Sequence, residues 1–162
     1  MNNKIDRRYL AGLIDGEGCI YFSNKSGQKR ETYSNLRLNI SNTYKPLMER
    51  LHDEFGGYLR THIDKHQFKS GRYRKIGYDL VLCNKQAEKL IRECLPYFII
   101  KKERAEIALD IRKNVFKYQA TGTFIPEEEI QKRKGLIDKI KILNKKGVPS
   151  LEFRKQLAYI EC

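Results

Sequence analysis

The chain carries the stretch LAGLIDGEG at residues 10–18, a short apolar helix pattern that ends in two carboxylates separated by one glycine. Glycine inside a helix costs about 0.8–1 kcal/mol relative to alanine, so Gly12 indicates that another backbone comes close at this point. Asp15 and Glu17 fall at the end of the predicted helix, where the helix dipole disfavours anions by about 0.3–1 kcal/mol. Acids in such a position favour a divalent cation as their counter-charge.

This nonapeptide resembles the LAGLIDADG motif of homing endonucleases and matches it at seven of nine positions, with Gly16 for alanine and Glu17 for aspartate. The competing interpretation is a buried helix with a glycine cap and two solvated acids. The resemblance extends over about residues 7–118, and the remainder of the chain, 119–162, is expected to be a C-terminal helical extension. We therefore predict one domain over residues 1–162.

The amino-acid composition indicates which class of molecule this chain binds. The formal net charge of +13, from 33 Lys and Arg against 20 Asp and Glu, favours a polyanion, although charge alone does not separate DNA from RNA or an anionic membrane. No apolar run approaches the roughly 20 residues that span a bilayer, and the first residues lack the apolar core of a secretory signal. The four cysteines form no CxxC pair, which favours reduced thiols and an intracellular location, in a prokaryotic cytoplasm or an organelle matrix.

The periodicity of apolar residues predicts an α+β fold with an antiparallel sheet. Asp6 is expected to cap the first helix, and Pro96 to end the third. The predicted helices are 7–15, 47–55, 85–94, 101–118 and 127–145. The first predicted strand begins at residue 19, and the other three are 36–41, 58–63 and 76–83. The resemblance implies the αββαββα fold of LAGLIDADG homing endonucleases, with a DNA-binding antiparallel sheet and extra C-terminal helices.

The helix 127–145 lies beyond the matching region and has two interpretations. Its basic residues either contact phosphates or form the solvated face of an amphipathic helix that supports the core, and the second is favoured. These residues are Lys132, Arg133, Lys139 and Lys141.

One copy of the motif occurs, and the chain shows no internal repeat. In the family, two motif helices pack side by side and both supply acids to a central active site. The resemblance to single-motif members therefore implies a homodimer, in which the helix meets its own copy across a two-fold axis. The expected dimer contacts are Leu10, Gly12 and Leu13.

The two predicted hairpins are strongly basic and are expected to bind DNA. An antiparallel ribbon fits the major groove, where Arg reads guanine and Asn reads adenine, whereas loop lysines suit phosphates. The alternating pattern places Arg37 and Asn39 on the face opposite the core. An ordinary solvated sheet face is the alternative interpretation. The expected DNA contacts are Lys25, Lys29, Arg30, Arg37, Asn39, Arg60, Lys65, Lys69, Arg72, Arg74 and Lys75.

The resemblance also implies the metal site. Glu17 matches the family's metal-binding acid, and the backbone carbonyl of Gly16 is the expected second ligand. Mg²⁺ is the expected ion, with Mn²⁺ as a substitute, and it needs only one or two carboxylates besides phosphate and water. Asp15 is assigned a lesser catalytic role, closing the helix end and shaping the local field.

Two further catalytic residues are expected. Asn42 follows the strand 36–41, where relatives carry a polar amide that orders the attacking water. Ser41 or Thr43 are alternatives for this role, and Asn42 is equally explained as a turn or helix-cap residue. Lys101 follows the run LPYFII at residues 95–100, which resembles the family's segment before a lysine that stabilises the transition-state anion. Lys101 is favoured over its neighbour Lys102.

These features predict a homodimeric, Mg²⁺-dependent DNA endonuclease that makes a double-strand break at a long, near-palindromic site. A free-standing chain that begins at Met1 favours an intron-encoded origin over an intein. The alternatives are an intron maturase that binds RNA and a DNA-binding regulator that does not cleave. Loss of the acids would favour either alternative. Glu17 and Lys101 are both present, which argues against both.

Overall fold

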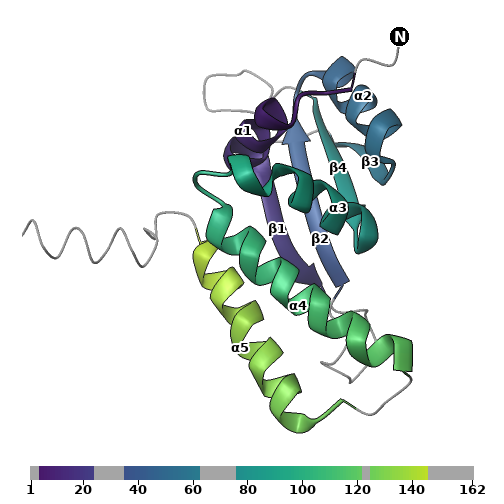
Figure 1. The fold of residues 1–162 in the computed structure, drawn as a ribbon. Coiled ribbons are helices and arrows are strands. Elements are labelled where there is room, and N and C mark those ends of the chain that lie inside the picture. The colour runs from purple at the N-terminus through teal and green to yellow at the C-terminus, as the bar shows by residue number, and fades with distance from the viewer. Residues whose placement is uncertain (1–3, 24–34, 63–75, 122–124, 146–162) are drawn as a thin grey trace, which may run out of the picture.

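The computed structural model describes residues 4–23, 35–62, 76–121 and 125–145. The predicted order αββαββα, followed by further helical structure, is confirmed (Figure 1). Most element boundaries differ from the predicted ones by one to three residues. The elements are α1 (Arg7–Glu17), β1 (Gly18–Ser23), β2 (Asn35–Asn42), α2 (Lys45–Phe55), β3 (Tyr58–His62), β4 (Gly77–Cys83), α3 (Lys85–Cys94), the 3-10 turn η1 (Leu95–Tyr97), α4 (Lys102–Thr121) and α5 (Glu127–Leu143).

The four described strands form one antiparallel sheet in the order β1-β2-β4-β3. Leu38 of β2 pairs with Ile20 on one side and Leu82 on the other, and all three side chains are fully buried. Because side chains alternate along a strand, this register sends one apolar set to the core and the intervening polar set to the opposite face.

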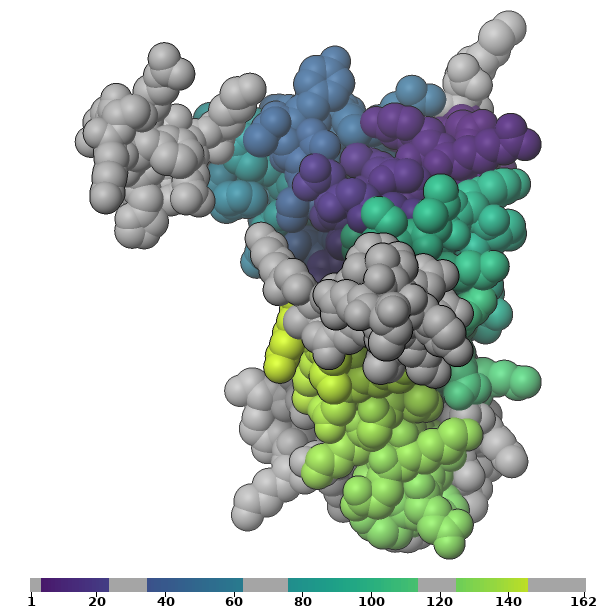
Figure 2. Space-filling view, turned by 90° about the vertical axis from the view of Figure 1, so that its left-hand side faces the viewer, coloured from purple at the N-terminus to yellow at the C-terminus, as the bar shows by residue number. Residues whose placement is uncertain are grey.

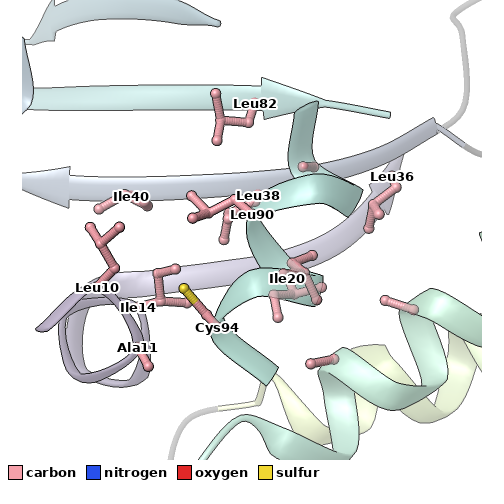
Figure 3. Close-up of a cluster of buried hydrophobic side chains, with 14 of the residues drawn as sticks. Leu10, Ala11, Ile14, Ile20, Leu36, Leu38, Ile40, Leu82, Leu90 and Cys94 are labelled. Carbon is pink, nitrogen blue, oxygen red and sulfur yellow. The ribbon is translucent and has the colours of Figure 1, made fainter. Parts of the chain in front are cut away.

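Helices α1 and α3 cover the apolar face of the sheet. Figure 3 shows Leu10 and Ile14 of α1 and Leu90 of α3 gathered over the leucines and isoleucines of the central strands. Leu10 has no solvent exposure within the single chain, so its predicted place in a dimer contact is wrong: burial in the chain's own core already uses this side chain. Gly12 is exposed and Leu13 is half-buried, so both stay available to a partner.

Short-range features of the sequence account for the ends of the first two helices. The predicted cap of α1 is confirmed, because Asp6 Oδ1 accepts hydrogen bonds from the backbone N–H groups of Arg8 (2.6 Å) and Tyr9 (3.3 Å). α2 ends where Gly56 and Gly57 adopt φ values of +68° and +94°, a conformation that favours glycine.

Helix α5 supports the core, as the favoured interpretation predicted. Ile140 and Leu143 are buried, and the side-chain amide of Asn144 donates to the carbonyl of Ile20 at 2.8 Å, along the outer edge of β1. Arg133 is buried beside Glu129, with Nε 2.8 Å from Oε1, so its alternative use as a phosphate contact is wrong. No described helix is both long and apolar enough to cross a membrane.

One arginine connects three helices at the start of α1. Arg7 Nη1 donates to Glu54 of α2 at 2.8 Å, and Nε donates to Glu93 of α3 at 2.6 Å. The guanidinium also lies 5.0 Å from the ring centroid of Phe55. All three charged side chains are partly buried, so these contacts are less screened by water than ordinary surface ion pairs.

We expect Arg7→Ala to destabilise the protein by about 1–3 kcal/mol, because it leaves two partly buried carboxylates without their partner. Urea unfolding followed by circular dichroism measures the change. Lys45→Ala is the control: it removes the exposed ion pair to Glu49 within α2 and should cost no more than about 0.5 kcal/mol. Equal effects of the two substitutions would contradict the role assigned to Arg7.

Candidate active site

Glu17, the last residue of α1, lines a pocket at one end of the sheet. Gly18 begins β1 and pairs with Ile40, so the preceding residue, Glu17, emerges beside the end of β2. The pocket has a volume of about 240 Å³. It is lined by Glu17, Ser41, Asn42, Thr43, His62 and Gly77. The structure thus places Glu17 together with Asn42 and with both alternatives to Asn42, although they lie far apart in the sequence.

The Asn42 side chain serves the chain turn that precedes α2. Its Oδ1 accepts a hydrogen bond from the backbone N–H of Tyr44 at 2.8 Å, as the turn interpretation of this residue predicted. The same side chain lines the pocket, and its amide nitrogen is not used in that turn. The Ser41 hydroxyl already has another partner, because its Oγ donates a hydrogen bond to Asp79 at 2.5 Å. Asn42 is therefore better suited than Ser41 to hold a water in the pocket.

A polar cluster around Asp79 adjoins this pocket. Arg60 places both Nε and Nη2 3.0 Å from Asp79 Oδ2, and His62 Nδ1 lies 3.4 Å from the same oxygen. Burial alone would raise the pKa of Asp79, but hydrogen bonds from Ser41 and Arg60, with the charges of His62 and Arg60, hold that pKa below its usual value. The cluster orients Arg60, a predicted DNA contact, on the sheet face opposite the core.

Asp79 is a residue of this face that the sequence alone did not identify. The available signal is its alternation within β4, where Asp79 stands between apolar residues that face the core. Its partners come from β2 and β3, and the sequence alone does not pair these strands with β4.

The predicted readout residues Arg37 and Asn39 lie on the non-core face of β2 and are half-buried. Asn39 Nδ2 donates to Ser41 Oγ at 3.3 Å. Arg37 Nε and Asn39 Oδ1 are both buried and have no hydrogen-bond partner among the described residues, so this face has unmet donor and acceptor capacity there. Several other predicted DNA contacts lie outside the described residues: Lys25, Lys29, Arg30, Lys65, Lys69, Arg72, Arg74 and Lys75.

Lys101 is buried against the C-terminal end of α1, with 7% of its surface exposed. Its Nζ donates to the backbone carbonyl of Asp15, one residue before Gly16. Burial and the nearby charge of Arg104 lower the pKa of Lys101, against opposing contributions from Asp15, Cys19 and Glu17. The neighbouring Lys102 is exposed on α4, so the two lysines occupy different environments.

The donor set of the pocket suits a hard divalent cation. Glu17 supplies an exposed carboxylate, and Ser41, Asn42 and Thr43 supply further oxygen atoms, the donor type that Mg²⁺ prefers. Within the described part of the chain, no group of three His, Cys, Asp or Glu side chains could hold a metal. A cation here would therefore draw its other ligands from the backbone, water, a bound phosphate or a second chain.

Comparisons with known proteins agree on one family and one fold. Residues 10–98, more than half of the chain, match the family model described as LAGLIDADG endonuclease. A search of curated proteins finds no match.

Solved structures of similar fold include three homing endonucleases or meganucleases. The homing endonuclease I-CvuI with DNA and Mg gives a TM-score of 0.62 at 18% identity, over 88% of this chain and 85% of that one. The archaeal intron-encoded homing endonuclease I-Vdi141I, complexed with DNA, gives a TM-score of 0.63 at 15% identity, over 96% of this chain and 94% of that one. The meganuclease I-SmaMI, bound to uncleavable DNA, gives a TM-score of 0.60 at 19% identity, over 90% of this chain but only 47% of that one. The predicted LAGLIDADG homing-endonuclease fold is confirmed.

The Asp79 cluster predicts an acid-dependent loss of stability. Because the folded-state pKa of Asp79 lies below its ordinary value of 3.8, the stabilisation is complete above pH 3.8 and is lost as pH falls through the lower, folded-state pKa. We expect the urea midpoint of the wild-type protein to fall more steeply in this acid range than that of Asp79→Asn. Parallel pH profiles for the two proteins would contradict this.

Proposed function

We propose, since the chain belongs to the LAGLIDADG endonuclease family, that it is a site-specific endonuclease that hydrolyses both strands of a DNA duplex. The observation that carries the proposal is the position of Glu17, exposed in an oxygen-lined pocket that opens beside the polar face of the sheet. A duplex bound on this sheet face would bring a backbone phosphate to the carboxylate.

The pocket residues fit hydrolysis assisted by a divalent cation. Glu17 and the Gly16 carbonyl would hold Mg²⁺, or Mn²⁺ as a substitute, which neutralises charge on the phosphate and helps to activate water. Asn42 would orient the attacking water through its side-chain amide. Lys101 would face the growing negative charge from the end of α1, where its burial favours a strong interaction with an anion.

We further propose that the sheet face reads the sequence of the duplex. Arg37 and Asn39 have unused hydrogen-bonding atoms on that face, and Arg60 is oriented there by Asp79. Arginine and asparagine in a major groove suit guanine and adenine. Those basic residues of the two hairpins that lie outside the described part of the chain would contact phosphates and set the position of the duplex.

The active protein is proposed to be a homodimer with α1 at the two-fold axis. Gly12 and Gly16 lie four residues apart on the exposed face of α1, and a Cβ atom added to either would meet nothing within 4 Å in the described part of its own chain. The absence of a side chain at these positions is therefore not required by this chain, and close approach of a second backbone would explain it. Exposed Tyr9, Ile99 and Ile100 beside this face would add apolar contact area.

A dimer of this kind has two pockets related by two-fold symmetry and predicts a long, near-palindromic target. We also propose an intron-encoded origin, like that of the archaeal homing endonuclease I-Vdi141I.

The first experiment exposes a randomised duplex library to the purified protein, with Ca²⁺ to score binding and Mg²⁺ to score cleavage. Cleavage at one near-palindromic site in Mg²⁺ would support both the endonuclease and its two-fold mode of binding. Enrichment of a site without cleavage would instead indicate a DNA-binding regulator. No enrichment would direct the next assay to RNA and the splicing of a host intron.

We expect Glu17→Gln to abolish cleavage while leaving DNA binding within a few-fold of wild type, because it removes the one carboxylate among the described residues that line the pocket. A gel-based cleavage assay and fluorescence anisotropy measure the two properties separately. Glu128→Gln, at an exposed acid in the first turn of α5, is the control and should cleave normally. Full cleavage by Glu17→Gln would exclude Glu17 from the metal site.

We expect Gly12→Leu to convert the dimer to a monomer without unfolding the chain, because a Cβ atom at Gly12 meets no described atom of its own chain within 4 Å, whereas a leucine would separate the two helices. Analytical ultracentrifugation measures the mass. Gly135→Leu is a matched control on α5, since a Cβ atom there also meets nothing within 4 Å. An unchanged mass for Gly12→Leu would refute this packing of α1.

A further inference from the structure

We propose that Asp15 is the positioning residue for Lys101: its carboxylate holds the segment 99–101 against the end of α1, so that the Lys101 amine is fixed beside Gly16 and Glu17. This inference rests on the proposed function, because it assigns Asp15 an effect on the cleavage step. It replaces the role expected from the sequence, in which Asp15 closed the end of its own helix and shaped the local field.

Both oxygens of the Asp15 carboxylate accept hydrogen bonds from the backbone of one distant segment. Oδ2 accepts hydrogen bonds from the N–H groups of Ile99 (2.8 Å) and Ile100 (3.2 Å), and Oδ1 accepts from the N–H of Lys101 (2.9 Å). Only 8% of Asp15 is exposed. Charge-assisted hydrogen bonds to a buried carboxylate are stronger than those between neutral groups, so this residue holds the segment firmly.

Lys101 is held by Asp15 at both of its ends. Its backbone N–H donates to the Asp15 carboxylate, and its side-chain Nζ donates to the Asp15 carbonyl. Two anchors on one residue leave the lysine side chain little freedom to adopt another rotamer. The amine therefore stays at the last turn of α1, directly before the backbone that the proposal assigns to the metal.

The side chains of Ile99 and Ile100 contribute little to holding the segment in place. Ile99 and Ile100 are 88% and 66% exposed, so their side chains contribute little burial within this chain. Phe98 is buried and anchors the segment on its N-terminal side, and α4 begins at Lys102. In Figure 2, α1 (purple) adjoins teal atoms on this face of the molecule. Asp15 thus connects these two parts of the surface through hydrogen bonds, beside the contact of the Arg8 guanidinium with the Tyr97 ring, 5.8 Å from its centroid.

The geometry argues against Asp15 as a second metal ligand. Both carboxylate oxygens already accept backbone N–H groups, and Asp15 does not line the pocket that contains Glu17. An asparagine at this position would keep the shape but would offer one acceptor oxygen, and its NH₂ group would face N–H donors. Asp15→Asn is therefore the substitution that loosens the segment with the least change in volume.

A double-mutant cycle under single-turnover conditions tests the proposal. At saturating DNA and Mg²⁺, Asp15→Asn should slow cleavage by roughly 10- to 100-fold, since a small displacement of a catalytic group has effects of that size. Lys101→Met should slow it at least as much. The double variant should match Lys101→Met within about two-fold, because Asp15 acts through Lys101. The DNA concentration that gives half-maximal rate should stay unchanged.

Amide hydrogen exchange supplies a measurement that does not depend on cleavage. In the wild-type protein, the amides of Ile99, Ile100 and Lys101 should be protected; in Asp15→Asn they should exchange faster while the amides of β2 stay protected. Asp110→Asn, at an exposed acid on α4, is the matched control and should change neither the rate nor the exchange. Unprotected amides in the wild-type protein would overturn the proposal even if Asp15→Asn failed to fold.

The outcomes separate this inference from the proposed function. If the rate effects of the two single variants multiply in the double variant, Asp15 acts independently of Lys101 and the inference fails. A raised Mg²⁺ requirement for Asp15→Asn, like that of a true ligand, would also overturn it. If the wild-type protein cleaves no duplex at all, the proposed function fails, and the positioning role in catalysis fails with it.

Discussion

α1 passes into β1 without a connecting residue, and the position of the proposed active site depends on this junction. A Cβ atom on Gly18 would lie 2.7 Å from the carbonyl oxygen of Ile14 and 2.7 Å from its Cγ2, so only glycine permits the turn. The register then places Gly18 opposite Ile40, and Glu17 emerges beside the end of β2. Of the three motif glycines, Gly18 is the one that the chain's own packing requires, whereas a Cβ atom at the other two meets open space.

The same helix carries the core and the site on different faces. Leu10 and Ile14 are fully buried over the sheet, and burying such a side chain contributes about 1.5–3 kcal/mol. That packing fixes the rotation of α1, which in turn aims Asp15 at the segment before α4 and leaves Gly12 exposed. A core substitution that rotates α1 would therefore disturb Glu17 and Lys101 together, so stability and site geometry are physically coupled.

The polar face of the sheet differs from an ordinary solvated face in how its charges are arranged. Asp79 is nearly buried among Ser41, Arg60 and His62. Burying this carboxylate has an unfavourable desolvation free energy, and the network lies on the face opposite the apolar core. Unmet donors and acceptors at Arg37 and Asn39 lie on the same face. A nucleic-acid duplex would satisfy these groups, which gives the arrangement a physical reason that solvation alone does not supply.

The sequence by itself determined the elements and the family, because these follow from local signals: apolar periodicity, the Asp6 cap, the glycines after α2 and the motif at residues 10–18. Only the tertiary structure decided the strand order, the burial of Leu10 and the partners of Asp15 and Asp79. Asp15 binds residues 84 to 86 positions away, and Asp79 binds Ser41 from 38 positions away. Such contacts depend on which strands and helices become neighbours, and no pattern of residue types within one element encodes that choice.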